Sequence, residues 1–441
     1  MPDLRIAFLH PDLGLGGAER LVVDAAAGLV DRNHQVAFWT SFFDPNRCFD
    51  ELKNIPVHVH GNWFPRCFFN KFFALCAYLR TFLTTITFIF HFLLPKNKSE
   101  RPHLVFVDQV AVVVPLLRLF RYKVLFYCHF PDKLLAPDAG KSLSQKSGLS
   151  IQNIERSQFF ITKFLRKFYR FPLNLAEEVS TGCANTILVN SNYTKKVFKV
   201  AFPHLKVEPS VLYPAVRLQS FLIDNEDDCE PIEGITSSDC IILSVNRFEK
   251  KKNIPLALEA FKSLQSLISF SIYKNIKLVL AGGYDPRVSE NVQVFNYLQD
   301  LVKQFNLEDR VVFVPSFSRK QHLSLLKMAR NGLLVYTPSN EHFGIVPIES
   351  MAAMVPVVAV NSGGPTESVV DGGTGYLCDP TPESFAQAMA KILTQKEVGK
   401  RFGELGRQRA VTMFGLDAFS KALEHYCIET VTCNRNVDKK D

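Results

Sequence analysis

Short apolar runs without regular polar alternation recur along the chain, and they constrain its fold more than any other feature. In the first half these runs are residues 5–10, 35–40, 104–108, 123–128 and 186–190. In the second half they are residues 240–245, 277–281, 311–314, 332–336 and 356–360. A strand that is apolar on both sides needs cover on both faces, which is the environment of a parallel sheet.

Helical patterns separate most of these strands. The clearest are residues 18–30, 255–267, 288–305, 319–329 and 347–354. Alternation of this kind predicts an α/β fold with two doubly wound, Rossmann-like domains whose strand ends face a central cleft. A segment at 212–238, which contains Pro214 and an acidic run at 224–233, has the composition of a surface linker. The first domain is therefore expected to cover residues 1–215.

Composition narrows the classes of partner. Lys and Arg together number 51 and Asp and Glu 43, so the chain has a net charge of +8, which suits an anionic partner. The ten cysteines form no C-x-x-C pair and no zinc spacing, which predicts reduced thiols in the cytosol and no metal site. The N-terminus does not have the pattern of a secretory signal. The basic residues form no extended stripe, so a nucleic-acid partner is not expected.

Two aromatic segments of the first domain are candidates for membrane contact. Residues 72–94 are almost long enough to span a bilayer, but Arg80 in the middle would be costly there. A helix lying in the membrane interface fits better, with lipid contacts expected at Phe72, Phe73, Phe82, Phe88 and Phe90. Residues 159–171 mix Phe and Tyr with Lys163, Arg166 and Lys167. An ordinary core helix with a charged face remains the alternative for each segment.

A glycine-rich loop follows the first strand. It includes Gly16 and Gly17 at the start of the helix 18–30, where backbone N–H groups are available to an anion. A dinucleotide-binding loop would have glycine where Glu19 stands, and an acidic residue where the second strand ends at Thr40. The loop therefore disfavours NAD.

Charged residues also follow strands of the second half. Arg247 and Lys252 come after the strand 240–245, where they could neutralise the charge of a departing diphosphate. Glu341 and Glu349 flank Gly344 and Ile345, so carboxylates for sugar hydroxyls stand beside amides for phosphate. A second glycine-rich turn follows at 362–367. Spacing alone does not show that these loops meet, although all of them follow the carboxyl ends of strands.

These motifs resemble those of known enzymes. The E-x7-E at Glu341 and Glu349, the R-x4-K at Arg247 and Lys252, and the GGAER loop are similar to retaining glycosyltransferases of the GT-B fold. More narrowly, HPDLGLGGAER, FYCHFPD, VNRFEKKKN, YTPSNEHFGIVPIESM and VNSGGPTES resemble the eukaryotic α-1,3/1,6-mannosyltransferases of the dolichol-linked oligosaccharide pathway in asparagine-linked glycosylation. The resemblance covers nearly the whole chain.

The resemblance implies an activity and a location. The enzyme would transfer mannose with retention from GDP-mannose to Man1GlcNAc2-diphosphate-dolichol, in α-1,3 and α-1,6 linkage, with no cofactor or required metal. It would work at the cytosolic face of the endoplasmic reticulum membrane, where other glycosyltransferases of the same pathway are potential partners. Residues 216–410 would form the nucleotide-sugar domain, and residues 411–441 a helix, including 417–426, that returns to the first domain, plus a tail.

The resemblance also implies roles for particular residues. The catalytic group would be Glu341, His129, Arg247 and Lys252. Arg247 and Lys252 would hold the donor diphosphate, Glu349 the ribose, and Glu341 and His129 the mannose. Further donor contacts would come from Phe343, Gly344, Ile345, Gly16 and Gly17. Two alternatives remain open: a glycosyltransferase of the same fold with another lipid acceptor, and a scaffold protein that has lost catalysis.

Overall fold

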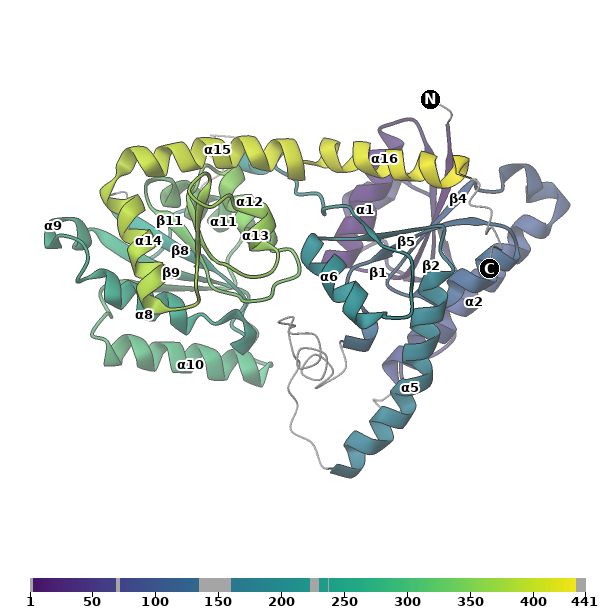
Figure 1. Cartoon of the computed structure of the whole chain (residues 1–441), viewed down its shortest axis with the longest axis horizontal. Helices are drawn as coiled ribbons and strands as arrows, with labels where there is room; N and C mark the ends of the chain where they lie inside the picture. Colours follow the sequence, from purple (N-terminus) through teal and green to yellow (C-terminus); the bar gives the residue numbers. More distant parts are fainter. Residues whose placement is uncertain (1–2, 69–71, 135–159, 223–229, 237, 434–441) are drawn as a thin grey trace. The chain divides into compact units, whose positions relative to one another are not determined.

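The computed structural model describes residues 3–68, 72–134, 160–222, 230–236 and 238–433. In the helix that starts at residue 160, the side chains are described from residue 168 onwards. The chain forms two compact units (Figure 1). The first consists of residues 1–215 and 416–441, and the second of residues 216–415. The second unit ends at Gly415, five residues beyond the boundary at residue 410 that the sequence predicted.

The first unit contains a seven-stranded sheet in the order β3-β2-β1-β4-β5-β6-β7, and every pairing is parallel. Its strands are β1 Arg5–Leu13, β2 Gln35–Phe43, β3 Val57–Val59, β4 Leu104–Asp108, β5 Lys123–Cys128, β6 Thr186–Val189 and β7 Ser210–Val211. Its helices are α1 Gly17–Val30, α2 Phe73–Leu93, α3 Val114–Leu119, α5 Phe160–Gly182, α6 Asn192–Ala201 and α16 Leu416–Thr432.

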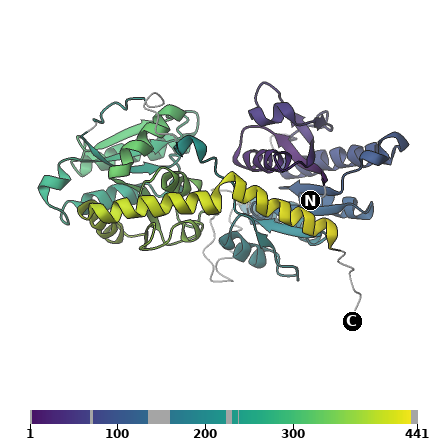
Figure 2. The same ribbon diagram turned by 90° about the horizontal axis from the view of Figure 1, so that it is seen from above.

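Both faces of this sheet are covered, as the apolar strands predicted. Along β1, Ile6 and Phe8 belong to a core shared with α1 and α16, whereas Ala7 and Leu9 belong to a core shared with α2, α3 and α6. Helix α16 belongs to the first unit and carries the C-terminal end of the chain (Figure 2). It is held to the loop after α1 by Glu424, whose carboxylate accepts hydrogen bonds from Arg32 at 2.7 Å and His34 at 3.2 Å. The C-terminal helix therefore completes one face of the first unit.

The second unit contains a six-stranded sheet in the order β10-β9-β8-β11-β12-β13, again parallel throughout. Its strands are β8 Cys240–Val245, β9 Ile276–Gly282, β10 Val311–Pro315, β11 Leu333–Tyr336, β12 Val357–Val360 and β13 Gly375–Cys378. Its helices are α7 Gln219–Leu222, α8 Pro255–Leu264, α9 Phe270–Tyr273, α10 Ser289–Gln304, α11 Arg319–Met328, α12 Ile345–Ala352, α13 Pro365–Ser368, α14 Pro382–Thr394 and α15 Lys396–Phe414. In both units the strand order reverses beside the first strand, which is the doubly wound pattern.

Two details of the strands differ from the sequence prediction. β1 continues past His10 to Leu13, because residues 12 and 13 pair with Phe42 and Phe43 of a longer β2. The strands β3, β7 and β13 were not predicted, because each has too few consecutive apolar residues to form a pattern. His10 therefore lies inside a strand and is 1% exposed.

Helix α2 packs one face against the sheet. Among the described residues it is the one helix whose length and hydropathy would allow it to cross a membrane, and 44% of its most apolar stretch is buried. Arg80 is 4% exposed and pairs with Asp12 at 3.1 Å, so its charge is met inside the protein. Phe88 is fully buried against Trp39 and Tyr122. The expectation that Phe88 contacts lipid is therefore wrong, because it lies on the helix face that covers the sheet.

Phe88 and Phe90 form a matched pair on this helix. We expect Phe88→Ala to lower the free energy of unfolding by about 3–5 kcal/mol, because truncation leaves a cavity in the core. Phe90 is 64% exposed, so Phe90→Ala is expected to change it by less than about 0.5 kcal/mol. Urea unfolding of the two variants measures the difference. Equal effects would contradict the orientation of α2.

Candidate functional site

Lys252 and Glu341 form an ion pair beyond the carboxyl ends of β8 and β11. Lys252 ends the short 3-10 helix Lys250–Lys252 and is 9% exposed. Its Nζ lies 2.5 Å from Oε2 of Glu341. The hydroxyl of Thr337, just after β11, donates to the backbone carbonyl of Lys252 at 2.8 Å. The two loops are thus joined at both backbone and side-chain level, 89 residues apart in sequence.

The pair keeps the Glu341 carboxylate ionised. Burial acts to raise the pKa of Glu341, but the charge and hydrogen bond of Lys252 outweigh it, so the pKa lies below its ordinary value. The neighbouring His342 has a pKa lowered to about 4 by burial, and therefore remains neutral. The site thus holds an ionised carboxylate, which can accept hydrogen bonds from hydroxyl groups, beside an ammonium group, which can bind an anion.

Arg247 lies on the same loop but has a different partner. Its side chain is 62% exposed, and its guanidinium pairs with Oε1 of Glu249 at 2.7 Å. Glu249 also pairs with Lys251 at 3.2 Å. Arg247 is therefore held at the loop surface by a neighbour that the sequence did not single out.

The glycine-rich turn at 362–364 packs directly on the loop that carries Glu341. The N–H of Gly364 donates to the carbonyl of Glu341 at 2.7 Å, and the Ser362 hydroxyl accepts from the N–H of Asn340 at 3.1 Å. A Cβ on Gly364 would lie 2.0 Å from the carbonyl oxygen of Phe343, so only glycine fits this contact. These two loops therefore meet, which spacing alone had left open.

The start of α12 determines how the remaining donor residues are presented. Gly344 precedes the helix with a φ of +81°, which favours glycine, and Ile345 is 43% exposed. Phe343 is 5% exposed and packs on Phe414, so contact with a donor would come from its backbone and not its ring. The helix predicted over residues 347–354 would place Glu349 in its first turn. In the structure Glu349 lies beyond the first turn, because α12 begins at Ile345.

In the first unit, His129 belongs to a linked group of side chains. Its Nε2 lies 3.1 Å from Oδ2 of Asp108, and Oδ1 of Asp108 lies 2.8 Å from Nδ1 of His10. Asp108 ends β4 and is 1% exposed, whereas the side chain of His129 is 22% exposed. Sequence reasoning missed Asp108, although a carboxylate that ends an apolar strand beside a candidate histidine was a usable signal.

The glycine-rich loop is short. Gly16 immediately precedes α1 and Gly17 is its first residue. A Cβ on Gly16 would lie 2.2 Å from Oε2 of Glu19, so the carboxylate of Glu19 folds back over the loop. Glu19 therefore already places negative charge at this helix N-terminus, where the sequence predicted a phosphate contact.

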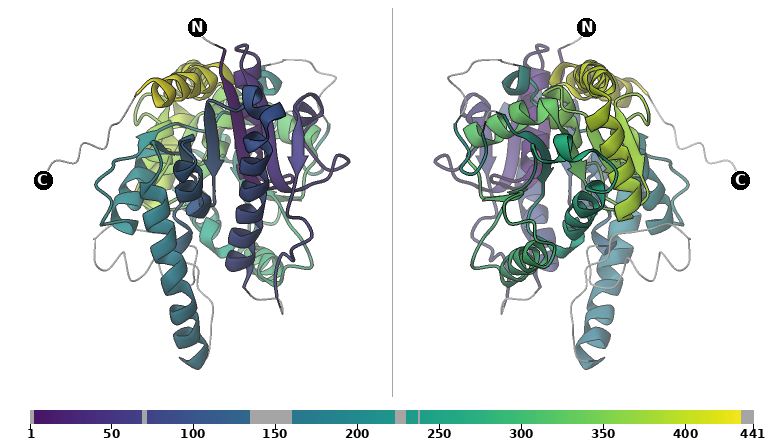
Figure 3. Two further views of the ribbon diagram at one scale, coloured as in Figure 1. Left: turned by 90° about the vertical axis from the view of Figure 1, so that its right-hand side faces the viewer. Right: turned by 90° about the vertical axis from the view of Figure 1, so that its left-hand side faces the viewer.

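Apart from the buried Phe88, the proposed membrane residues whose side chains the structure describes are exposed. Besides Phe90, the exposed fractions are 42% for Phe72, 59% for Phe73 and 38% for Phe82. Helix α5 runs beside α2 and extends past the sheet (Figure 3), and the Phe72 and Tyr169 rings lie 5.3 Å apart. The two aromatic segments are therefore adjacent. The side chains of Lys163, Arg166 and Lys167 lie outside the described ones.

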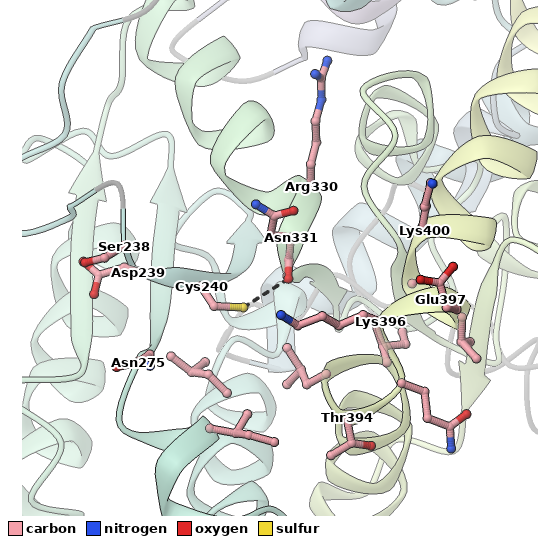
Figure 4. A pocket seen from close by; sticks show the side chains of 18 of the residues that line it. Ser238, Asp239, Cys240, Asn275, Arg330, Asn331, Thr394, Lys396, Glu397 and Lys400 are labelled. Atoms are coloured by element: carbon pink, nitrogen blue, oxygen red, sulfur yellow. Dashed lines mark hydrogen bonds between the residues drawn. The ribbon is translucent and has the colours of Figure 1, made fainter.

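A separate hollow of the second unit lies at the opposite edge of its sheet (Figure 4). Its lining includes Cys240 and Ile276, which begin β8 and β9, and Lys396, which begins α15. Ligands of doubly wound sheets bind beyond the carboxyl ends of the strands. The hollow is thus distinct from the Lys252–Glu341 site.

Comparison with protein families assigns each half of the chain. Residues 226–409 match "Glycosyl transferases group 1" and residues 15–220 match "Glycosyltransferase Family 4". The "Alpha-1,3/1,6-mannosyltransferase ALG2" of Rhizomucor pusillus is 41% identical, with 98% of this chain and 92% of that protein covered. The protein of the same name from Homo sapiens is 40% identical, with 97% and 96% covered.

Solved structures agree with the fold. A sucrose-phosphate synthase from Thermosynechococcus elongatus superposes with a TM-score of 0.66 at 21% identity, covering 97% of this chain and 98% of that one. Together with the two family matches, this confirms the predicted GT-B class with two Rossmann-like domains.

Glu349 provides a test of the local electrostatics. Burial raises its pKa to about 7, against an ordinary value of 4.5 and a weaker opposing effect of Arg319. The folded state then binds the proton more tightly than the unfolded state, so this contribution to stability is complete below pH 4.5 and is lost as the pH rises through 7. We expect Glu349→Gln, which mimics the protonated carboxyl, to raise the free energy of unfolding at pH 8 by up to about 3 kcal/mol.

At pH 5 the same substitution is expected to have a much smaller effect. Urea unfolding at the two pH values measures the difference, with Glu404→Gln on the exposed face of α15 as the matched control. A Glu349→Gln effect that is the same at both pH values would show that the carboxyl is not held protonated by burial.

Proposed function

The chain belongs to the alpha-1,3/1,6-mannosyltransferase family, and we propose that it transfers mannose with retention from GDP-mannose to Man1GlcNAc2-diphosphate-dolichol. The assignment of this function to a site rests on the part-buried Lys252–Glu341 pair beyond the strand ends of the second unit. It combines the two chemistries that a nucleotide-sugar donor requires.

Lys252 would bind the donor diphosphate. In the structure its ammonium is already oriented by Glu341 at 2.5 Å and by the fixed backbone of the loop. A bound diphosphate would share this ammonium with Glu341, and the charge that develops on departing GDP would strengthen the contact. Arg247, exposed on the same loop, would exchange Glu249 for phosphate.

The sugar and ribose would be held by carboxylates and by His129. Glu341 is ionised and accepts hydrogen bonds from mannose hydroxyls, next to the backbone amides around Gly344. Glu349, one turn into α12, would contact the ribose. In a retaining transfer on one face, the acceptor hydroxyl oxygen bonds to the anomeric carbon of mannose while the bond from that carbon to GDP breaks. The leaving phosphate oxygen accepts the proton of the acceptor hydroxyl.

We propose that this transfer needs no metal. Lys252 and Arg247 supply positive charge where a metal would otherwise balance a diphosphate. A glycosyltransferase of the same fold with another lipid acceptor would need the same positive charge, so only the choice of acceptor distinguishes that alternative.

The acceptor is proposed to be reached from a membrane surface. Phe72, Phe73, Phe82 and Phe90 are exposed on and beside α2, and Phe168 and Phe171 are 78% and 70% exposed on α5. Aromatic side chains favour the interface between lipid and water. The cytosolic face of the endoplasmic reticulum membrane is the proposed location, with other glycosyltransferases of the pathway as candidate partners.

The full chain in lipid, supplied with GDP-mannose and synthetic Man1GlcNAc2-diphosphate-lipid, tests the function. We expect mass spectrometry to show a gain of two hexoses, with linkages identified by mannosidase digestion and with the same yield in EDTA. A gain of one would separate the two activities. Binding of GDP-mannose without transfer would point to another acceptor, and loss of transfer in EDTA would reject the metal-free proposal.

Lys252→Ala tests the role of the ion pair. Losing a donor aimed at the leaving group is expected to lower kcat by about 10²–10³-fold, and Arg247→Ala should fall in the same range. Lys250→Ala, two residues away and exposed, is the matched control and should retain most of the activity. Steady-state transfer rates decide, and a near-normal kcat for Lys252→Ala would reject its assignment to the diphosphate.

A further inference from the structure

The hydrogen-bond partners of His10 determine its protonation state. Nδ1 of His10 lies 2.8 Å from Oδ1 of Asp108, and Nε2 lies 3.1 Å from the backbone carbonyl oxygen of Asp12. A carbonyl oxygen and an ionised carboxylate only accept hydrogen bonds, and a neutral imidazole has a single N–H. Both contacts are satisfied together only if His10 carries two ring protons and is an imidazolium.

The alternative is a proton on Asp108, and the surrounding charges oppose it. Burial acts to raise the pKa of Asp108, but His10 and His129 outweigh burial and the pKa lies below its ordinary value. Burial likewise acts to lower the pKa of His10, but Asp108 outweighs it and the net pKa is raised. Glu19, in the first turn of α1, also favours the charged ring. The charge therefore lies on both partners.

A second buried histidine of the same unit shows the opposite arrangement. Nδ1 of His34 accepts from the backbone N–H of Leu4 at 3.1 Å, and Nε2 lies 3.2 Å from Oε1 of Glu424. One nitrogen must therefore be unprotonated while the other donates, so His34 is neutral although it also pairs with a carboxylate. His34 is a matched internal reference for His10.

Asp108 divides its two oxygens between two histidines. Oδ1 accepts from the His10 imidazolium, and Oδ2 accepts from Nε2–H of His129 at 3.1 Å. This fixes the His129 tautomer with its proton on Nε2, and leaves Nδ1 with no hydrogen-bond partner among the residues that the structure describes. Asp108 therefore fixes the orientation of the His129 ring through this contact.

We propose that His10 and Asp108 are positioning residues for the transfer: His10 is a buried imidazolium that fixes Asp108, and Asp108 fixes His129 so that an unprotonated Nδ1 accepts a hydrogen bond from a mannose hydroxyl. The role in transfer rests on the function proposed above, whereas the protonation of His10 does not. The tautomer of a catalytic histidine is commonly set in this way by a carboxylate on its other nitrogen.

Ring nitrogen NMR of the full chain labelled with ¹⁵N-histidine tests the protonation directly. At pH 8 a free histidine is largely neutral, but we expect His10 to show two protonated ring nitrogens and His34 to show one. His10→Gln and His34→Gln assign the two signals. A bare nitrogen on His10 at pH 8 would overturn the proposal, whether or not the protein transfers mannose.

Asp108→Asn tests the link to the reaction. An amide has one accepting oxygen and one donating NH2, so it cannot accept from both histidines. We expect kcat to fall at least about tenfold, GDP affinity of the second unit to stay unchanged by calorimetry, and His10 to lose its second proton at pH 8. Wild-type kcat with an unchanged His10 signal would reject the positioning role.

The controls keep the two proposals separate. His34→Gln should retain transfer, because it alters a buried histidine–carboxylate pair that does not reach His129. If Asp108→Asn fails to fold, the spectrum of the unchanged protein still decides the charge on His10. If the unchanged protein shows a doubly protonated His10 but transfers no mannose, the proposed function fails while the imidazolium assignment stands.

Discussion

Two parallel sheets that are covered on both faces impose the main constraint on this protein. Neither face can accept an unpaired charge, because helices bury both of them against apolar strands. Polar side chains therefore gather at the strand ends, where the loops leave the sheet. Lys252, Glu341 and His129 all stand in such positions, and Asp108 is the last residue of β4. The chemistry of the protein follows from where the sheets tolerate charge.

Several buried ionisable groups of the first unit lie beside a polar partner. Arg80 would be costly in a lipid-spanning helix, but it meets Asp12 and the carbonyl of Ser41 within the protein. His10 and His34 illustrate the same rule with opposite results. Each is buried beside a carboxylate, yet the second contact is a carbonyl for one and an N–H for the other. The second partner, and not the depth of burial, determines which ring is charged.

Contacts within the protein position the charged groups of the second unit. Lys252 and Glu341 already compensate each other, so neither is left as an isolated buried ion. The tight contact between Gly364 and Phe343 keeps the Glu341 loop in place. Rigid positioning of this kind reduces the reorganisation needed when charge develops on a leaving diphosphate. The pKa of Glu349 is raised by burial, and of the residues that the structure describes only Arg319 opposes this, whereas Glu341 is paired with Lys252 at 2.5 Å.

The sequence by itself determined the alternation of strands and helices, the division near residue 215, and the loops that carry the charged residues, because burial on two faces leaves a continuous apolar pattern. It did not reveal β3, β7 or β13, which have too few consecutive apolar residues for such a pattern. It also did not reveal that Phe88 belongs to the core while Phe90 is exposed. Only the tertiary structure decided the pairings between Lys252 and Glu341 and between His10, Asp108 and His129. Lys252 and Glu341 are 89 positions apart in the sequence, and His10 and Asp108 are 98 apart. Each pair is brought together because its two strands are neighbours in a sheet, and no local sequence pattern encodes the order of the strands.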